Sequence, residues 1–94
     1  IPSINPNTIA DGLLTSLGKR NFPIIMSYVK EIVTVSEDSI IKAMKLIYER
    51  MKIIIEPSSA VTLAALIENK VKAKGSNIGL IISGGNVDLS KLPF

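Results

Sequence analysis

Cysteine, histidine and tryptophan are absent from this sequence of 94 residues. Without cysteine the chain has neither a disulfide framework nor a thiolate metal site, and its redox compartment cannot be inferred. The absence of both cysteine and histidine also argues against zinc chemistry, because these residues supply most zinc ligands. We therefore expect no metal-binding residue in this chain.

The sequence also has no large excess of positive or negative residues and no long apolar run. The net charge is only +3, and Lys and Arg are interspersed with Asp and Glu, so no basic stripe points to nucleic acid. No apolar segment reaches the length that a membrane span requires, and no basic-then-apolar leader opens the chain. We expect a cytoplasmic protein that binds neither nucleic acid nor membranes.

Aromatic residues make up only 4% of the chain, although hydrophobic residues make up 47%. A chain of this length forms at most one small domain and buries a limited share of its surface. The apolar excess suggests that many of these side chains face something outside the chain. The sequence also begins with Ile1 instead of methionine. Both features predict a piece of a larger protein.

The most informative stretch is residues 78–88, I-G-L-I-I-S-G-G-N-V-D. Its apolar, β-branched beginning, residues 78–82, is typical of a strand buried on both faces of a parallel sheet. Ligands bind just outside the carboxyl ends of such strands. There Ser83 offers a hydroxyl, and the Gly84-Gly85 pair allows positive φ and lets the backbone approach a ligand closely. The same glycine pair also fits a plain hairpin turn, so both interpretations stay open.

Residues 22–29 form the first predicted helix, because Asn21 can cap it and proline is tolerated in a first turn. Residues 31–35, E-I-V-T-V, are predicted to be a strand by their β-branched content. The order of these two elements is helix, then strand.

A second helix is predicted from a cap at Ser36 to about Lys52. Acidic residues in its first turn favour the positive end of the helix dipole. Its apolar residues recur at i, i+4, i+7 and i+11, which is one stripe facing a core. Met44 and Met51 belong to this stripe and are therefore predicted to fill the core.

A third helix is predicted from Pro57 to about Asn69, since proline suits a first helical turn. Ser58 and Ser59 at its start are small. They either leave N–H groups accessible to an anion or simply pack tightly against a neighbouring strand. The whole order is helix, strand, helix, helix, strand, which indicates an α/β fold.

Four motifs occur in an order that carries a specific resemblance: T-I-A-D-G at 8–12, E-I-V-T-V-S-E-D at 31–38, E-R-M-K-I-I-I-E-P at 49–57 and S-G-G-N-V-D-L at 83–89. Together they resemble the C-terminal part of serine racemase and the related serine/threonine dehydratases. These are fold-type II enzymes that depend on pyridoxal phosphate. The resemblance implies that residues 1–94 are the C-terminal portion of the large domain of a tryptophan-synthase-β-like fold, with the N-terminal part missing.

The resemblance also implies a partial cofactor site. Ser83 matches the hydroxyl that hydrogen-bonds the pyridine nitrogen, and Gly12 matches a glycine whose backbone lines the pocket near the ring. Gly84 is expected to bring its backbone close to the cofactor. Glu56 matches a carboxylate near the cofactor, although it also fits a structural cap or a buried hydrogen-bond partner. A neutral hydroxyl at the ring nitrogen tempers the electron sink, because it does not hold the nitrogen protonated as a carboxylate would.

Lys52 and Asn86 match positions that contribute to an ATP effector site in the animal racemases. Lys52 fits an ordinary lysine at a helix end equally well. The family's cofactor-binding lysine lies in an S-x-F-K-x-R-G motif that is absent here. The glycine-rich phosphate loop, the serine of the opposite face and the acidic loop that binds a divalent cation are absent too. The chain is therefore expected to supply one wall of the site and no catalytic residue, and to be inactive alone.

By resemblance, the full-length enzyme would act on L-serine or L-threonine. It would racemise the amino acid, eliminate its β-hydroxyl to give a 2-oxo acid and ammonia, or do both. The rest of the same polypeptide would complete the site, the whole would form a homodimer, and a divalent cation and ATP would be further ligands. The alternative is a non-catalytic α/β remnant or binding module from a truncated gene. The sequence leaves racemase and dehydratase, and serine and threonine, undistinguished.

Overall fold

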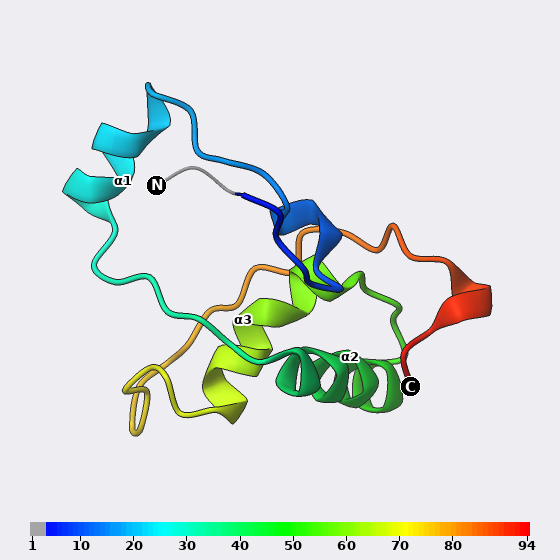
Figure 1. Ribbon diagram of the computed structural model, residues 1–94. Coiled ribbons are helices and arrows are strands. Elements are labelled where there is room, and N and C mark those ends of the chain that lie inside the picture. Colours follow the sequence, from blue (N-terminus) through cyan, green and yellow to red (C-terminus); the bar gives the residue numbers. More distant parts are fainter. Residues whose placement is uncertain (1–3) are drawn as a thin grey trace.

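Residues 4–94 are described by a computed structural model. In order, the elements are the 3₁₀-helix η1 (Asp11–Leu13), the helices α1 (Asn21–Tyr28), α2 (Glu37–Met51) and α3 (Pro57–Ile67), and the 3₁₀-helix η2 (Leu89–Lys91). The molecule is flat, with extents of 38 × 37 × 19 Å. Figure 1 shows α2 beside α3, while α1 lies apart from them, between two long connections.

Helix α2 begins and ends where the sequence predicts. The Ser36 side chain accepts the N–H of Ser39 at 3.2 Å and so caps the first turn. At the other end Lys52 adopts the left-handed conformation, with φ of 60°, and stops the helix. Met44 is buried as predicted, but Met51 is 56% exposed. The prediction that Met51 fills the core is wrong, because Met51 is the last residue of α2 and lies outside the core cluster.

Helix α3 begins at Pro57 and is built largely from small residues on its buried side. Ala60 and Ala64 have no exposed surface, and neither has Ala43 on α2. Alanine at such positions lets two helices pack closely, so most of the core lies between α2 and α3. The buried apolar residues form one cluster: Ala10, Ile40, Ala43, Met44, Ile47, Ile55, Ala60 and Ala64.

Helix α1 is shifted by one residue from its prediction. Asn21 was expected to cap the helix, but it is the first helical residue, and Arg20 takes the cap position without a side-chain hydrogen bond. No residue of α1 is buried. The helix therefore contributes nothing to the core of residues 4–94.

The two predicted strands are not confirmed. Residues 31–35 and 78–82 have no regular secondary structure, and no strand occurs anywhere in residues 4–94. A strand acquires its hydrogen bonds only from a paired neighbour, and the described part of the chain provides none. Ile32 is 73% exposed and Ile81 is 78% exposed, while Ile82 packs against the core cluster. The predicted helix order is therefore confirmed, and the predicted strand order is not.

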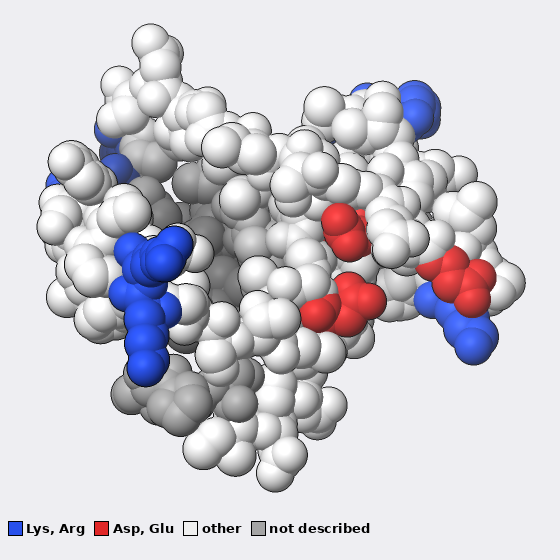
Figure 2. All heavy atoms as spheres, turned by 90° about the horizontal axis from the view of Figure 1, so that it is seen from above, with Lys and Arg blue, Asp and Glu red and all other residues white. Residues whose placement is uncertain are grey.

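Charged side chains lie in small, separate groups on the surface. Figure 2 shows one face, on which most of the area belongs to neither acidic nor basic residues. On α2, Lys45 Nζ lies 3.8 Å from Glu49 Oε1, and both side chains are more than half exposed. Such a pair contributes little to stability. None of the helices within residues 4–94 combines the length and the apolar character needed to cross a membrane.

Candidate functional site

The segment around Ser83 is attached to the first turn of α3. The backbone N–H of Glu56 donates to the Gly84 carbonyl at 3.1 Å. The Ser59 hydroxyl donates to the same carbonyl at 2.8 Å and accepts the N–H of Gly84 at 2.8 Å. Ser59 Oγ also lies 3.1 Å from Ser83 Oγ. These bonds place Ser83 and Gly84 directly against the start of α3.

A second segment, which contains Gly12 of η1, reaches the same helix end. The N–H of Gly12 donates to Ser58 Oγ at 2.9 Å. A Cβ at Gly12 would stand only 2.8 Å from that oxygen, so a side chain there would press against Ser58. All four predicted cofactor-binding residues, Gly12, Glu56, Ser83 and Gly84, therefore meet at the first turn of α3.

Glycine at positions 84 and 85 allows other parts of the chain to lie close to the backbone. A Cβ at Gly84 would collide with Oε1 of Glu56, so the carboxylate lies over the glycine backbone. A Cβ at Gly85 would lie 2.8 Å from the carbonyl oxygen of Ile54. Neither glycine has a positive φ, and neither lies in a turn. The described chain therefore has no hairpin turn at these two glycines.

Ser59 is the residue at this site whose part the sequence did not reveal. It is 1% exposed, and its hydroxyl contacts both Ser83 and Gly84. The tight packing that was one interpretation of the small residues opening α3 is observed, and their accessibility to an anion stays a prediction. The sequence could have pointed to Ser59 because it lies on the apolar side of the helix. A buried hydroxyl there requires a hydrogen-bond partner.

The resemblance assigns Ser83 to one side of a pyridoxal ring, and the surroundings of its hydroxyl can be compared with that assignment. Ser83 is exposed as a residue, and its hydroxyl lies 3.1 Å from that of the buried Ser59. A pyridine nitrogen needs one polar partner of this kind. The neighbouring backbone of Gly12 and Gly84 carries no side chain that would keep a flat ring away. Glu56 adds a carboxylate next to Gly84.

The two predicted ATP-binding residues are not joined by a hydrogen bond among the described residues. Lys52 Nζ donates to the Glu49 carbonyl at 2.7 Å, so its amine caps the end of its own helix. Asn86 is exposed in the segment that follows the site.

Asp88 lies two residues beyond Asn86 and accepts hydrogen bonds from the hydroxyl and the backbone N–H of Ser90. The hydroxyl, followed by the N–H, lowers the pKa of the Asp88 carboxyl below its ordinary value. Asp88 thereby caps η2.

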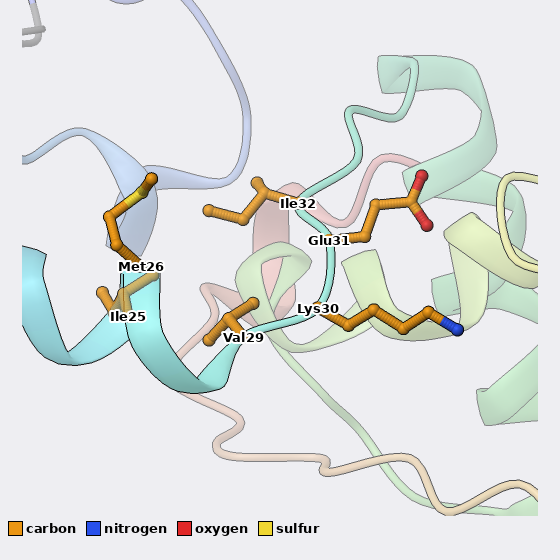
Figure 3. Close-up of a pocket in the computed structure, with 6 residues that line it drawn as sticks. All are labelled: Ile25, Met26, Val29, Lys30, Glu31 and Ile32. Atoms are coloured by element: carbon orange, nitrogen blue, oxygen red, sulfur yellow. The ribbon is translucent and has the colours of Figure 1, made fainter.

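A hollow of about 310 Å³ lies elsewhere, between the end of α1 and the segment that follows it. Figure 3 shows Lys30 and Glu31 extending away from the apolar side chains of Met26 and Val29. None of the four predicted cofactor-binding residues lines this hollow. The candidate site at the start of α3 is therefore separate from this hollow.

Comparison with known families agrees with this site. Residues 2–84 match the family described as pyridoxal-phosphate dependent enzyme. Because the match extends over most of the chain, the chain belongs to this family.

Individual relatives narrow the class further. The chain is 58% identical over 89 residues to a serine racemase of Dictyostelium discoideum, with 93% of this chain and 28% of the relative covered. It is 46% identical over 89 residues to a beta-hydroxyaspartate dehydratase of Paracoccus denitrificans (strain Pd 1222), with 95% and 28% covered. The solved structure of a T.th. threonine deaminase superposes with a TM-score of 0.87 at 41% identity, with 96% of this chain and 33% of that chain covered. The chain thus spans about a third or less of the length of these relatives.

Proposed function

We propose that this chain is the C-terminal part of a pyridoxal-phosphate-dependent racemase or dehydratase of L-serine or L-threonine. Its products would be the opposite enantiomer, or a 2-oxo acid and ammonia. The observation that carries the proposal is the meeting of Gly12, Glu56, Ser83 and Gly84 at the first turn of α3. These residues come from three separate segments, and the resemblance assigns all four of them to one cofactor site. The names of the relatives support the substrate class.

In this proposal Ser83 binds the pyridine nitrogen through its hydroxyl. When bound, the cofactor supplies the electron sink that makes an amino acid α-proton removable. Gly12 and Gly84 would present bare backbone beside the ring, and Glu56 would place a carboxylate at its edge. A hydroxyl stabilises a protonated ring nitrogen less than a carboxylate does. Ser83 would therefore limit how strongly the cofactor ring withdraws electrons.

The remainder of the enzyme would supply what this chain does not contain. The cofactor lysine and the phosphate loop would come from the rest of the polypeptide, in agreement with the 28% share of the relatives that this chain spans. Strands from that part would pair with residues 31–35 and 78–82 and complete the large α/β domain. Exposed apolar side chains such as Ile32 and Ile81 would then be covered.

Several features of the whole enzyme are part of the same proposal. It would be a cytoplasmic homodimer, with a divalent cation and ATP as further ligands. Lys52 and Asn86 would contribute to the ATP site. For Lys52 this requires its amine to leave the Glu49 carbonyl that it now contacts.

The test begins with the coding sequence upstream of Ile1. A continuous open frame with an S-x-F-K motif and a glycine-rich loop supports the proposal. The full-length protein should then release pyruvate from L-serine or exchange serine enantiomers only when pyridoxal phosphate is present. A start codon just before Ile1 would instead support a non-catalytic remnant or binding module.

A further inference from the structure

The segment that leads to Gly12 is held by side chains of two different helices. Every backbone N–H in residues 9–13 has a hydrogen-bond partner. Three of these N–H groups donate to oxygens of the segment itself or of the residue before it. The other two leave the segment: Ile9 donates to Glu37 Oε2 at 3.0 Å, and Gly12 donates to Ser58 Oγ at 2.9 Å. One bond to α2 and one bond to α3 therefore attach the segment to the helices.

Apolar packing fixes the same segment only weakly. Ala10, between the two attachment points, is 1% exposed and belongs to the core cluster. Its side chain is a single methyl group, so its burial contributes little compared with that of a large apolar residue. The course of the backbone from Ile9 to Gly12 therefore depends on the hydrogen bonds at both of these residues.

Glu37 provides a firm attachment point for Ile9. It is the first residue of α2, where a carboxylate also suits the positive end of the helix dipole. The start of α2 is itself fixed, because the Ser36 side chain caps it and Glu68 accepts the N–H of Ser36. A hydrogen bond from an N–H to a carboxylate is stronger than one between neutral groups.

We propose that Glu37 is a positioning residue, which holds Ile9 and thereby sets the place of the Gly12 backbone in the cofactor site. This inference rests on the proposed function, in which Gly12 lines the pocket near the ring. Glu37 acts there through Ile9 and not by contact with the ring. Without its carboxylate, the bond from Gly12 to Ser58 would be the one remaining hydrogen bond between residues 9–13 and the helices that form the core.

The experiment compares Glu37→Ala with Glu68→Ala in the full-length enzyme. Both changes remove a partly buried carboxylate that accepts a backbone N–H near the start of α2, but Glu68 holds Ser36 and not the site segment. Titration of the apoenzyme with pyridoxal phosphate gives the dissociation constant. It should rise about two- to tenfold in Glu37→Ala, as expected for the loss of one hydrogen bond. In Glu68→Ala it should equal that of the wild type.

Amide hydrogen exchange of residues 9–13 in the same variants tests the attachment without the cofactor. Exchange should become faster in Glu37→Ala and stay unchanged in Glu68→Ala, because only the first change releases Ile9. Glu37→Gln keeps an acceptor oxygen and should restore most of the cofactor affinity. If Glu37→Ala does not fold, Glu37→Met keeps the length of the side chain without its oxygens and should show the same losses.

The two measurements separate the possible failures. Unchanged exchange in Glu37→Ala overturns the attachment itself. Faster exchange with an unchanged dissociation constant overturns the role of Glu37 in the site, and so does an equal loss of affinity in Glu68→Ala. A wild-type enzyme that does not bind pyridoxal phosphate overturns the proposed function, and this inference with it.

Discussion

The carboxylate of Glu68 accepts the backbone N–H of Ser36 at 2.8 Å. Glu68 follows the last residue of α3, and Ser36 is the cap of α2. One side chain therefore completes the N-terminus of a neighbouring helix, where backbone N–H groups lack partners and the helix dipole favours negative charge. This bond joins the two helices that enclose the core at the end far from the candidate site.

Replacing Glu68 by glutamine tests this contact. Glu68→Gln should lower the free energy of unfolding of the full-length protein by about 1 kcal/mol, because the amide keeps an acceptor but loses the charge. Urea unfolding followed by circular dichroism measures the difference. Glu49→Gln, which alters an exposed ion pair on α2, is the control and should change stability by less than about 0.5 kcal/mol. Equal effects in both variants would contradict a special role for Glu68.

Alanine at the two site glycines should have different consequences. A Cβ at Gly85 meets the backbone carbonyl of Ile54, which cannot move independently, whereas a Cβ at Gly84 meets the flexible end of Glu56. Gly85→Ala should therefore cost about 1–3 kcal/mol of stability. Gly84→Ala should instead displace the Glu56 carboxylate and mainly weaken cofactor binding.

Thermal unfolding and cofactor titration of the full-length protein separate these two outcomes. Gly18→Ala is the control, since the nearest atom to a Cβ there is Nδ2 of Asn21 at 4.0 Å and the position lies outside both predicted strands. A Gly85→Ala variant as stable as Gly18→Ala would show that the close contact with Ile54 does not constrain the segment.

The assignment of Ser83 can be tested with two substitutions of opposite effect. Ser83→Ala should keep the fold and cost about 1–3 kcal/mol of cofactor or transition-state interaction, because the ring nitrogen loses its partner. Ser83→Asp should hold the ring nitrogen protonated and alter the ratio of elimination to racemisation. Pyruvate release and serine enantiomer exchange, measured side by side, give this ratio. A merely structural Ser83 predicts the same ratio and the same cofactor absorbance in both variants.

The chain of 94 residues alone should be inactive and should expose apolar surface. Phe22 is 50% exposed, Tyr28 is 86% exposed and Ile81 is 78% exposed. Such side chains bind hydrophobic dyes when they have no partner. The isolated chain should therefore bind such a dye and melt without a sharp transition, and serine assays should read background. A cooperative melt without dye binding would instead identify a complete domain.

The helices could be predicted because their signals are local. Ser36 and Lys52 mark the ends of α2 within a few residues of the helix that they cap, and Pro57 marks the start of α3. The strands could not be verified in the same way, because residues 31–35 and 78–82 depend on partners that residues 4–94 do not contain. Local sequence determines a cap, whereas a strand depends on distant pairing.

The candidate site was predictable only through the motif resemblance. Composition and spacing singled out Ser83 and the glycines after it, but they did not connect this segment with Gly12 or Glu56. Ser59 was missed because its partners lie far along the chain, at Ser83 and Gly84. A serine near a helix start has so many ordinary uses that its spacing alone says little about which one applies.

Ser58 and Ser59 are consecutive residues of one helical turn, and each holds a different segment. Through Ser58 the turn holds Gly12, and through Ser59 it holds Gly84. A rotation or translation of α3 would therefore carry both segments with it as a single rigid unit. The spacing of Gly12 and Gly84 would change little while their orientation changed, so in the proposed enzyme a motion of this helix would reorient a bound ring without loosening it.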